Sequence, residues 1–236
     1  MARRSEQPRR KRRGGSRRQR IVEHVMQHRI STNSVIHKHI CPDLTPNAVS
    51  KATTRLCAKG LLVQHPLFLT TNYFTLGSAG ARLLGVPLYR ARPLGPQALV
   101  IEYGVLAHAA MGSTYRQRLT SADLDELLPG VRPLLVHAAY CLDESSCPSV
   151  LELVRVDLGG GADHVARKAA FDFRLRRNEP AFQPWLSDHR LRLVIVTGST
   201  DKSAAIRAAV NQHLWPDGLS IHLAVVTPLL RLTGRI

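Results

Sequence analysis

The sequence has few acidic residues, few cysteines and no long apolar run. Its 236 residues include 17 aspartates and glutamates against 33 lysines and arginines, a formal net charge of +16. The four cysteines form no Cys-x-x-Cys pair, so no disulfide framework is indicated and a reducing compartment is expected. No apolar run approaches the roughly 18–20 residues that span a bilayer, and the N-terminus lacks the apolar core of a signal peptide. We therefore expect a cytoplasmic protein that binds no membrane.

Clustered metal ligands are also scarce. His137, Cys141 and Cys147 form the nearest grouping, but two cysteines six positions apart with one histidine do not match zinc-site spacing. Residues 159–161 and 198–203 have residue types found in phosphate loops without the required spacing. We expect no metal and no cofactor.

The positive charge that is present indicates a polyanionic partner. Ten of the lysines and arginines, with one acid, fall in residues 1–20. Residues 1–16 have almost nothing to bury, so a disordered basic tail is expected there. Such a tail can lie along phosphates or enter a minor groove, or it can be a solvated extension that only raises nonspecific affinity. Nucleic acid is the first candidate partner.

A helix with a defined start and stop is predicted over residues 45–60. Thr45 can cap it, Pro46 suits its first position, and Gly60 can adopt the positive φ that ends helices. Small and apolar residues at helical spacing form the expected buried stripe: Ala48, Val49, Ala52, Leu56 and Cys57. The opposite face is polar and cationic and has no carboxylate: Asn47, Ser50, Lys51, Thr54 and Arg55. Such a face suits the major groove of DNA.

The surrounding segments complete a helix-helix-helix-hairpin order. We expect a helix from Arg17 to about His28, a second helix through residues 34–40 capped by Ser31, Thr32 or Asn33, strands at 61–65 and 72–76, and a tip at 66–71. The run from Leu56 to Leu62 and the run from Tyr73 to Gly85 resemble the winged-helix domains of bacterial regulators and of plasmid replication or mobilisation proteins. The resemblance implies a winged helix-turn-helix domain over residues 17–86, which can bind DNA or serve protein contact alone.

The residues expected to contact DNA come from three places in this region. They are Thr45, Asn47, Ser50, Lys51, Thr54 and Arg55 on the third helix, Gln64, His65, Thr70, Thr71 and Asn72 on the hairpin, and Arg17 and Arg18 at the start of the first helix.

Residues 87–96 contain three prolines and are expected to link this domain to a second one over residues 97–236. Helices are predicted at 97–111, 163–177 and 201–214, a turn capped by Ser121 through Leu128, and strands at 115–120, 131–141, 150–158, 191–197 and 219–227. Strands separated by helices predict an α/β sandwich with a mixed sheet.

This second order of elements resembles the restriction-endonuclease-like fold. The whole chain resembles the replication-relaxation family of plasmid and integrative-element proteins, which join a winged helix to such a domain; the matching pieces are residues 99–108, 130–133 and 154–159, with Arg167-Lys168 downstream. The resemblance implies metal-assisted hydrolysis of phosphodiesters, for which carboxylates hold Mg²⁺ and a lysine orients water. Only Asp157 and Lys168 match these positions, because Leu134 and Arg155 stand where carboxylates are implied. We therefore expect a nuclease-like scaffold without a working metal site.

Other charged residues of this domain have less specific interpretations. Glu152 lies at an odd offset from Asp157 and is expected on the opposite face of its strand, Asp143 is expected in a polar loop, and Arg155 can pair with Asp157. The helix at 163–177 is basic, and Phe171 and Phe173 within it are expected to belong to the core. Its cations are Arg167, Lys168, Arg174, Arg176 and Arg177, which can be a second DNA contact or a solvated face.

The first functional hypothesis is a sequence-selective double-stranded DNA-binding protein, a transcriptional regulator or accessory factor of a mobile element. It is expected to act as a homodimer on repeated half-sites and to associate with the bacterial nucleoid. The alternative is a Mg²⁺-dependent DNA nickase or relaxase that uses Asp157 and Lys168. A third hypothesis is an adaptor whose second domain binds another protein.

Overall fold

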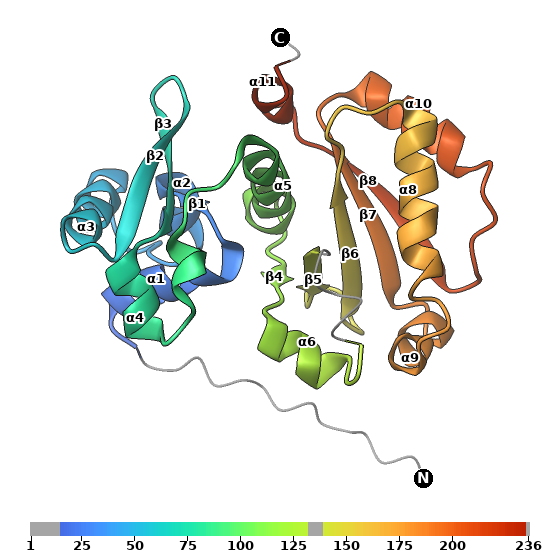
Figure 1. Ribbon diagram of the computed structural model, residues 1–236, viewed down its shortest axis with the longest axis horizontal. Coiled ribbons are helices and arrows are strands. Elements are labelled where there is room, and N and C mark those ends of the chain that lie inside the picture. Colours follow the sequence, from blue (N-terminus) through green and yellow to red (C-terminus); the bar gives the residue numbers. More distant parts are fainter. Residues whose placement is uncertain (1–14, 132–138, 235–236) are drawn as a thin grey trace.

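The computed structural model describes residues 15–131 and 139–234, so most of the predicted tail at 1–16, and Leu134 and His137, lie outside the described residues. The chain is mixed α/β with a three-stranded and a five-stranded sheet (Figure 1). The helices are α1 (Arg17–His28), α2 (Asn33–His39), α3 (Pro46–Ala58), α4 (Ser78–Leu84), α5 (Pro96–Leu106), α6 (Ser121–Leu127), α8 (Ala162–Arg174), α9 (Gln183–Ser187), α10 (Thr200–Val210) and α11 (Leu229–Leu232). The shorter helical turns are η1 (Leu88–Ala91), the π-helical η2 (Ala107–Met111) and η3 (Pro180–Phe182). The strands are β1 (Ser31–Thr32), β2 (Leu62–Phe68), β3 (Thr71–Leu76), β4 (Gln117–Arg118), β5 (Ala139–Asp143), β6 (Val150–Val156), β7 (Leu191–Thr197) and β8 (Leu219–Val225).

The small sheet has the order β1-β3-β2 and is antiparallel, with α1 to α4 around it. The predictions of α1, α2, α3 and a following hairpin are confirmed. The predicted tip at 66–71 is wrong, because β2 continues to Phe68 and the turn shrinks to Leu69 and Thr70. Pro66 is tolerated because β2 is an edge strand and its pairing shifts register between Pro66 and Phe68.

The large sheet has the order β4-β5-β6-β7-β8, antiparallel as far as β6 and parallel from β6 to β8. The helices α8 and α10 make the crossovers that parallel pairing requires. All residues of β7 except Arg192 are buried, as the continuous apolar run predicted. The prediction of a mixed sheet is confirmed. Of the strand predicted at 131–141, only the end is seen in β5, and residues 132–138 lie outside the described residues.

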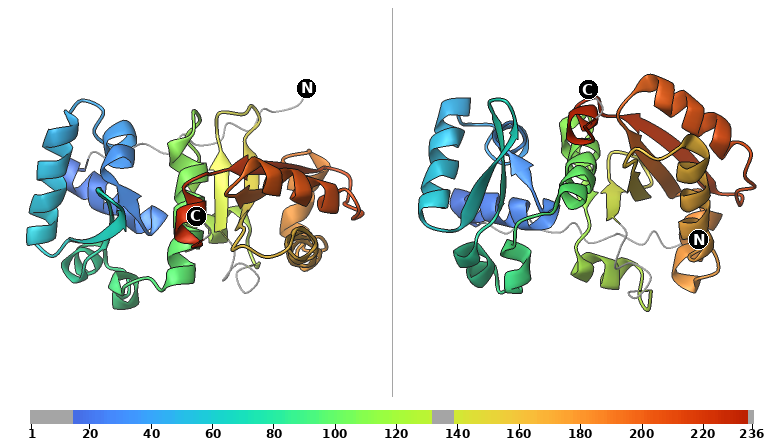
Figure 2. Two further views of the ribbon diagram at one scale, coloured as in Figure 1. Left: turned by 90° about the horizontal axis from the view of Figure 1, so that it is seen from above. Right: turned by 45° about the horizontal axis from the view of Figure 1, so that its top comes forward.

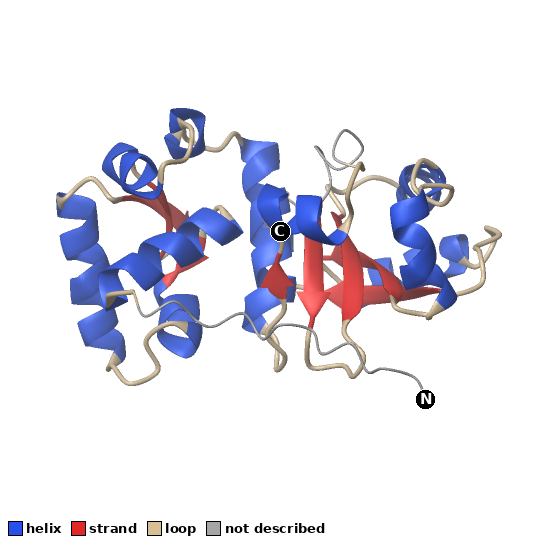
Figure 3. Cartoon of the chain, turned by 90° about the horizontal axis from the view of Figure 1, so that it is seen from below, coloured by secondary structure: helices blue, strands red, loops and turns tan. Residues whose placement is uncertain are grey.

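Helices cover both faces of the large sheet (Figure 3). Side chains of α8, α9 and α10 pack with Leu151, Leu193 and Ile195 on one face. On the other face α5, η2 and α11 pack with Val154, Val194 and others. The helix α6 also packs on the first face. Its predicted cap is wrong, because Thr120 and not Ser121 precedes the helix. The Thr120 hydroxyl accepts from the Asp123 N–H, and the Asp123 carboxylate accepts from the Thr120 N–H.

The helix α5 with its extension η2 lies between the two sheets (Figures 1 and 2). Every residue from Glu102 to Ala110 is buried, which is the expected state of a helix that is apolar around its circumference. Gly104 lets β6 approach closely, since a Cβ there would lie 2.7 Å from both methyl groups of Val156. On its other side, α5 shares a hydrophobic cluster with Ile30, Val35 and Tyr73. The segment 87–96, which includes η1, therefore connects parts that share one core.

Polar contacts reinforce this junction. Arg118 of β4 pairs with the buried Glu102 of α5 and donates to the His28 carbonyl at 2.7 Å. The Gln27 side chain donates to the Arg118 carbonyl at 2.6 Å, and His39 Nε2 donates to the Ala110 carbonyl at 2.6 Å. These bonds join α1 and α2 to the segment between α5 and β5.

Three histidines and a tyrosine fill the space beside these bonds. The rings of His24 and His28 lie 4.5 Å apart, and Tyr115 contacts the rings of both His28 and His39. The Nδ1 atom of His28 is buried and makes no hydrogen bond to the described residues. Burial, with the nearby His39, lowers the pKa of His24 to about 3. Burial, with His24, Arg118 and His39 nearby, lowers the pKa of His28 well below its usual value.

These two histidines predict a loss of stability in mild acid. The unfolded chain takes up protons near pH 6.5 whereas the folded chain keeps both rings neutral, so the free energy of unfolding falls as the pH drops below 6.5. The slope is about 1.4 kcal/mol per pH unit for each histidine. We expect urea unfolding to show a loss of about 4 kcal/mol between pH 7 and pH 5.

The matched variants are His24→Gln with His28→Gln, which should flatten this slope, and His189→Asn at an exposed position, which should leave it unchanged. An equal slope in all three proteins would contradict the assignment.

Candidate nucleic-acid interface

The helix α3 is held by its caps and by one buried edge. The Thr45 hydroxyl accepts from the Ala48 N–H at 3.2 Å, Pro46 occupies the first turn, and Gly60 has a φ of 64° beyond the last turn. Val49 and Leu56 are buried, as predicted. The other members of the predicted stripe are only half-buried: Ala48, Ala52 and Cys57.

Thr53 is fully buried, and the sequence pattern missed it. Its hydroxyl contacts Asn33 Oδ1 at 2.9 Å and the Val49 carbonyl at 3.2 Å. The bond to Asn33 joins the start of α2 to the middle of α3 and so helps to fix their crossing. The available signal was the position of Thr53, four residues after Val49 on the apolar side of the helix.

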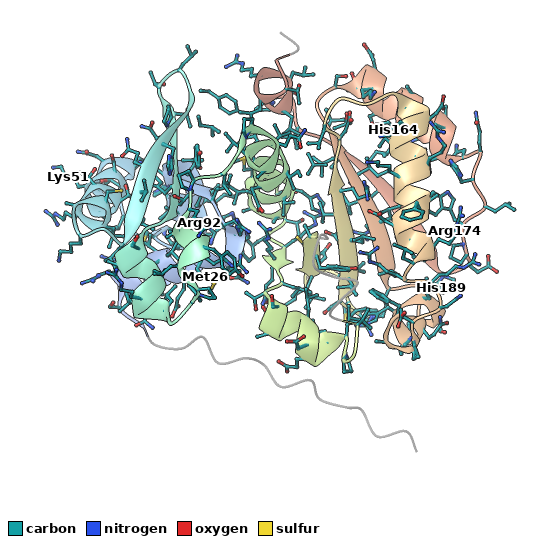
Figure 4. All side chains as sticks on the ribbon, viewed as in Figure 1. Met26, Lys51, Arg92, His164, Arg174 and His189 are labelled. Carbon is teal, nitrogen blue, oxygen red and sulfur yellow. The ribbon has the colours of Figure 1, made fainter. Side chains whose placement is uncertain are left out.

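The opposite face of α3 is open. Every residue assigned to it from the sequence is exposed: Asn47, Ser50, Lys51, Thr54 and Arg55. The Thr54 hydroxyl donates to the Ser50 carbonyl at 2.9 Å, so it lies against the helix. Within residues 15–131 and 139–234, no carboxylate pairs with Lys51 or Arg55. In Figure 4, Lys51 points away from the body of the molecule. We call this surface the α3 face.

The hairpin residues divide into two groups. Gln64, Thr70 and Thr71 are exposed and Asn72 is half-buried. His65 turns toward its own hairpin: its Nε2 shares a hydrogen bond with the Thr75 hydroxyl at 3.0 Å, and its ring stacks on Tyr73 at 4.9 Å. The prediction that His65 reaches DNA therefore loses support, because burial lowers its pKa and its ring already has partners.

The two arginines at the start of α1 that were predicted to contact DNA have different surroundings. Arg17 donates to the Asp43 carboxylate at 2.6 Å, between two exposed side chains, so it braces the loop that leads into α3. Exposed ion pairs of this kind contribute little stability, about 0–1 kcal/mol. Arg18 is exposed.

The two residues assigned to a nuclease reaction lie in different hollows. Asp157 follows β6, is buried, and accepts from the Gly159 N–H at 2.8 Å and the Thr197 hydroxyl at 3.3 Å. Lys168 is exposed on α8 beside Arg155. The suggested pair of Arg155 with Asp157 is wrong, since Arg155 pairs with Asp172 of α8. Alternation along β6 turns Arg155 toward that helix.

The carboxylates that do come together are Glu152 and Asp143. In the register of β5 and β6, Cys141 lies opposite Glu152, so Asp143, two residues further, points to the same face. Glu152 has no exposed surface, and its oxygens lie 2.6 Å from His108 Nε2 and 2.8 Å from Arg192 Nη1. Arg116 Nε lies 3.2 Å from Glu152 and 3.9 Å from Asp143, and Arg192 Nη1 lies 3.7 Å from Asp143.

Cations therefore occupy the space beside both carboxylates. Burial alone would raise the pKa of Glu152, but the hydrogen bond and charge of His108, with Arg116 and Arg192, hold this pKa below its ordinary value. Among the described residues, no group of three histidine, cysteine or acidic side chains could hold a metal ion. The sequence pattern did not predict this cluster, because its residues come from distant segments and Glu152 could be compared only with the nearby Asp157.

Two further expectations, for Phe171 of α8 and for Arg176 just after it, are wrong. Phe173 is buried, as predicted, but Phe171 is 56% exposed. Arg176, assigned to the basic patch, is buried and donates to the Tyr140 hydroxyl at 2.7 Å. Arg167, Lys168, Arg174 and Arg177 remain exposed.

Known proteins give no further guide. Comparisons with protein-family models, with curated proteins and with solved structures find no match. Across the described residues, no helix has the length and apolar character needed to cross a membrane.

The buried Glu152 cluster makes a prediction about stability. Glu152→Gln removes the charge that His108, Arg116 and Arg192 share, and breaking a buried ion pair in this way costs about 3–5 kcal/mol. We expect urea unfolding at pH 7 to show a loss of this size.

Glu144→Gln, at an exposed position beside the cluster, is the matched control and should change the free energy of unfolding by less than about 0.5 kcal/mol. Equal stability of the two variants would show that the cluster is not a structural ion network.

Proposed function

We propose that the chain is a sequence-selective double-stranded DNA-binding protein in which residues 17–86 act as a winged helix-turn-helix and α3 enters the major groove. The observation that carries this proposal is the α3 face. It is exposed, polar and free of carboxylates, and it includes two cations with no ion-pair partner among the described residues. Side chains of these types read base edges, since asparagine suits adenine and arginine or lysine suits guanine.

The hairpin of β2 and β3 is proposed as the wing. Strand β2 packs beside α3 (Figure 1). The exposed Gln64, Thr70 and Thr71 of the hairpin are proposed to reach phosphates or a neighbouring minor groove. The contact of Phe68 with Tyr103 of α5, with ring centres 5.4 Å apart, braces the wing from behind. A braced wing keeps a fixed distance to α3, which favours one spacing between grooves.

Residues 97–236 are proposed as a nuclease-like scaffold in a regulator or accessory factor of a mobile element. The mixed sheet between α5 and the pair α8 and α10 supports this fold, as does the resemblance to the replication-relaxation family. A homodimer held through this part would match repeated half-sites. The nickase alternative has weaker support, because Asp157 and Lys168 line separate hollows and Glu152 is already paired with cations.

The α3 face can be tested by mutation. The DNA site is first found by footprinting the protein on the DNA around its own gene. Lys51→Ala with Arg55→Ala should then weaken binding to that site, since each lost base contact costs about 1–3 kcal/mol. Binding to unrelated duplex should fall much less. Affinities for the two DNAs are measured at a fixed salt concentration.

Two controls distinguish loss of a sequence-specific contact from simple loss of positive charge. Arg82→Ala with Arg92→Ala removes the same charge from exposed positions outside α3 and should preserve the preference for the site. Deletion of residues 1–14 should lower affinity for every sequence and reduce the salt dependence. If the tail deletion removes the preference while the α3 variant keeps it, the roles assigned here are reversed.

A supercoiled-plasmid assay with Mg²⁺ or Mn²⁺ tests the nickase alternative. We expect no nicking that depends on Asp157. Nicking by the parent chain that disappears in Asp157→Ala would replace our proposal.

A further inference from the structure

A second exposed surface of unusual composition follows one side of α8. Its residues recur at steps of three and four: His164, Arg167, Lys168, Phe171, Arg174 and Leu175. We call this surface the α8 face. The other side of α8 is buried in the core through Val165, Ala169 and Phe173. Phe171 and Leu175 therefore remain exposed although the helix has a well-packed apolar side, with 56% and 47% of their surfaces accessible.

A hollow of about 440 Å³ opens on this face. Its lining consists of Arg155, His164, Arg167, Lys168, Phe171 and Asp172. The one acidic residue in that lining, Asp172, pairs with Arg155. Arg167 donates to the Asp163 carbonyl, and neither Arg167 nor Lys168 forms an ion pair within the described residues. The hollow thus has an exposed aromatic ring at one wall and two uncompensated cations beside it.

These features point to a polyanion with accessible flat rings. Cations on one helix face suit phosphates, whereas an exposed phenylalanine beside them suits stacking on an unpaired base. A duplex does not present the faces of its bases, so it would leave Phe171 unused. We propose that the α8 face binds single-stranded nucleic acid, with Phe171 stacking on a base and Arg167, Lys168 and Arg174 contacting the backbone.

The position of this surface makes it independent of the proposed function. Lys51 on α3 and Arg174 on α8 lie toward opposite ends of the long axis of the molecule (Figure 4), and the same separation of the two helices is seen in both views of Figure 2. The α3 face and the α8 face therefore belong to separate parts of the surface. One molecule can therefore hold a duplex at one end and a single strand at the other.

The test measures binding of the full chain to a fluorescent thymidine oligonucleotide of about 15 nucleotides and to a duplex of unrelated sequence. Phe171→Ala should weaken binding to the single strand about tenfold and leave duplex binding unchanged. Phe171→Trp should keep single-strand binding, because the larger ring still stacks, whereas Phe171→Leu should behave as Phe171→Ala. Arg167→Ala with Lys168→Ala should weaken single-strand binding and reduce its salt dependence.

Matched controls isolate the effect. Leu83→Ala removes an exposed apolar side chain on α4 and should change nothing. Lys51→Ala with Arg55→Ala should keep single-strand binding, so failure of the α3 proposal and failure of this one are distinguishable. Unchanged urea midpoints confirm that the variants fold.

Three results would overturn the proposal. The first is single-strand binding that is the same in Phe171→Ala and the parent chain. The second is an equal loss of duplex and single-strand binding in Phe171→Ala, which indicates a general phosphate contact. The third is Phe171-dependent self-association in sedimentation with no effect on nucleic acid, which assigns the surface to a second copy of the chain.

Discussion

The burial of α5 between two sheets is the constraint on which the rest of the structure depends. A helix with nine consecutive buried residues, Glu102 to Ala110, cannot be stable with one side in water, so it requires cover on each side. The five-stranded sheet covers one side, and Ile30, Val35 and Tyr73 contribute to the other. The N-terminal part is thereby placed against α5 by the hydrophobic effect, which is not directional.

The orientation of the N-terminal helices on α5 is set by polar groups at the same junction. Hydrogen bonds are directional, so the bonds at this junction fix how α1 and α2 are aligned on α5. They are the bonds from Arg118 to Glu102 and to the His28 carbonyl, and the bond from His39 to the Ala110 carbonyl. Phe68 against Tyr103 extends this alignment to the hairpin. The orientation of the α3 face relative to the rest of the molecule is thus set by contacts in which α3 itself takes no part.

Sequence reasoning succeeded where the signal was local. The caps at Thr45 and Gly60, the open face of α3 and the buried run of β7 each follow from neighbouring residues. It failed where the answer depended on pairing between distant segments. Glu152 and Asp143 meet only through the register of β5 and β6, and Arg155 finds Asp172 only when α8 packs on the sheet. Phe171 and Phe173 lie two residues apart and therefore on different sides of the helix, and which of them joins the core depends on where α8 packs on the sheet.

The shared core has a consequence for how such a protein can change during evolution. Recombination that joined residues 17–86 to another partner would carry Ile30, Val35 and Tyr73 without the helix that covers them, leaving an apolar surface that favours aggregation. The segment that must be inherited as one piece is therefore longer than residues 17–86. It includes the large sheet as well as α5 and η2, because a crossover after residue 111 would leave the side of α5 that packs on Val154 and Val194 without cover.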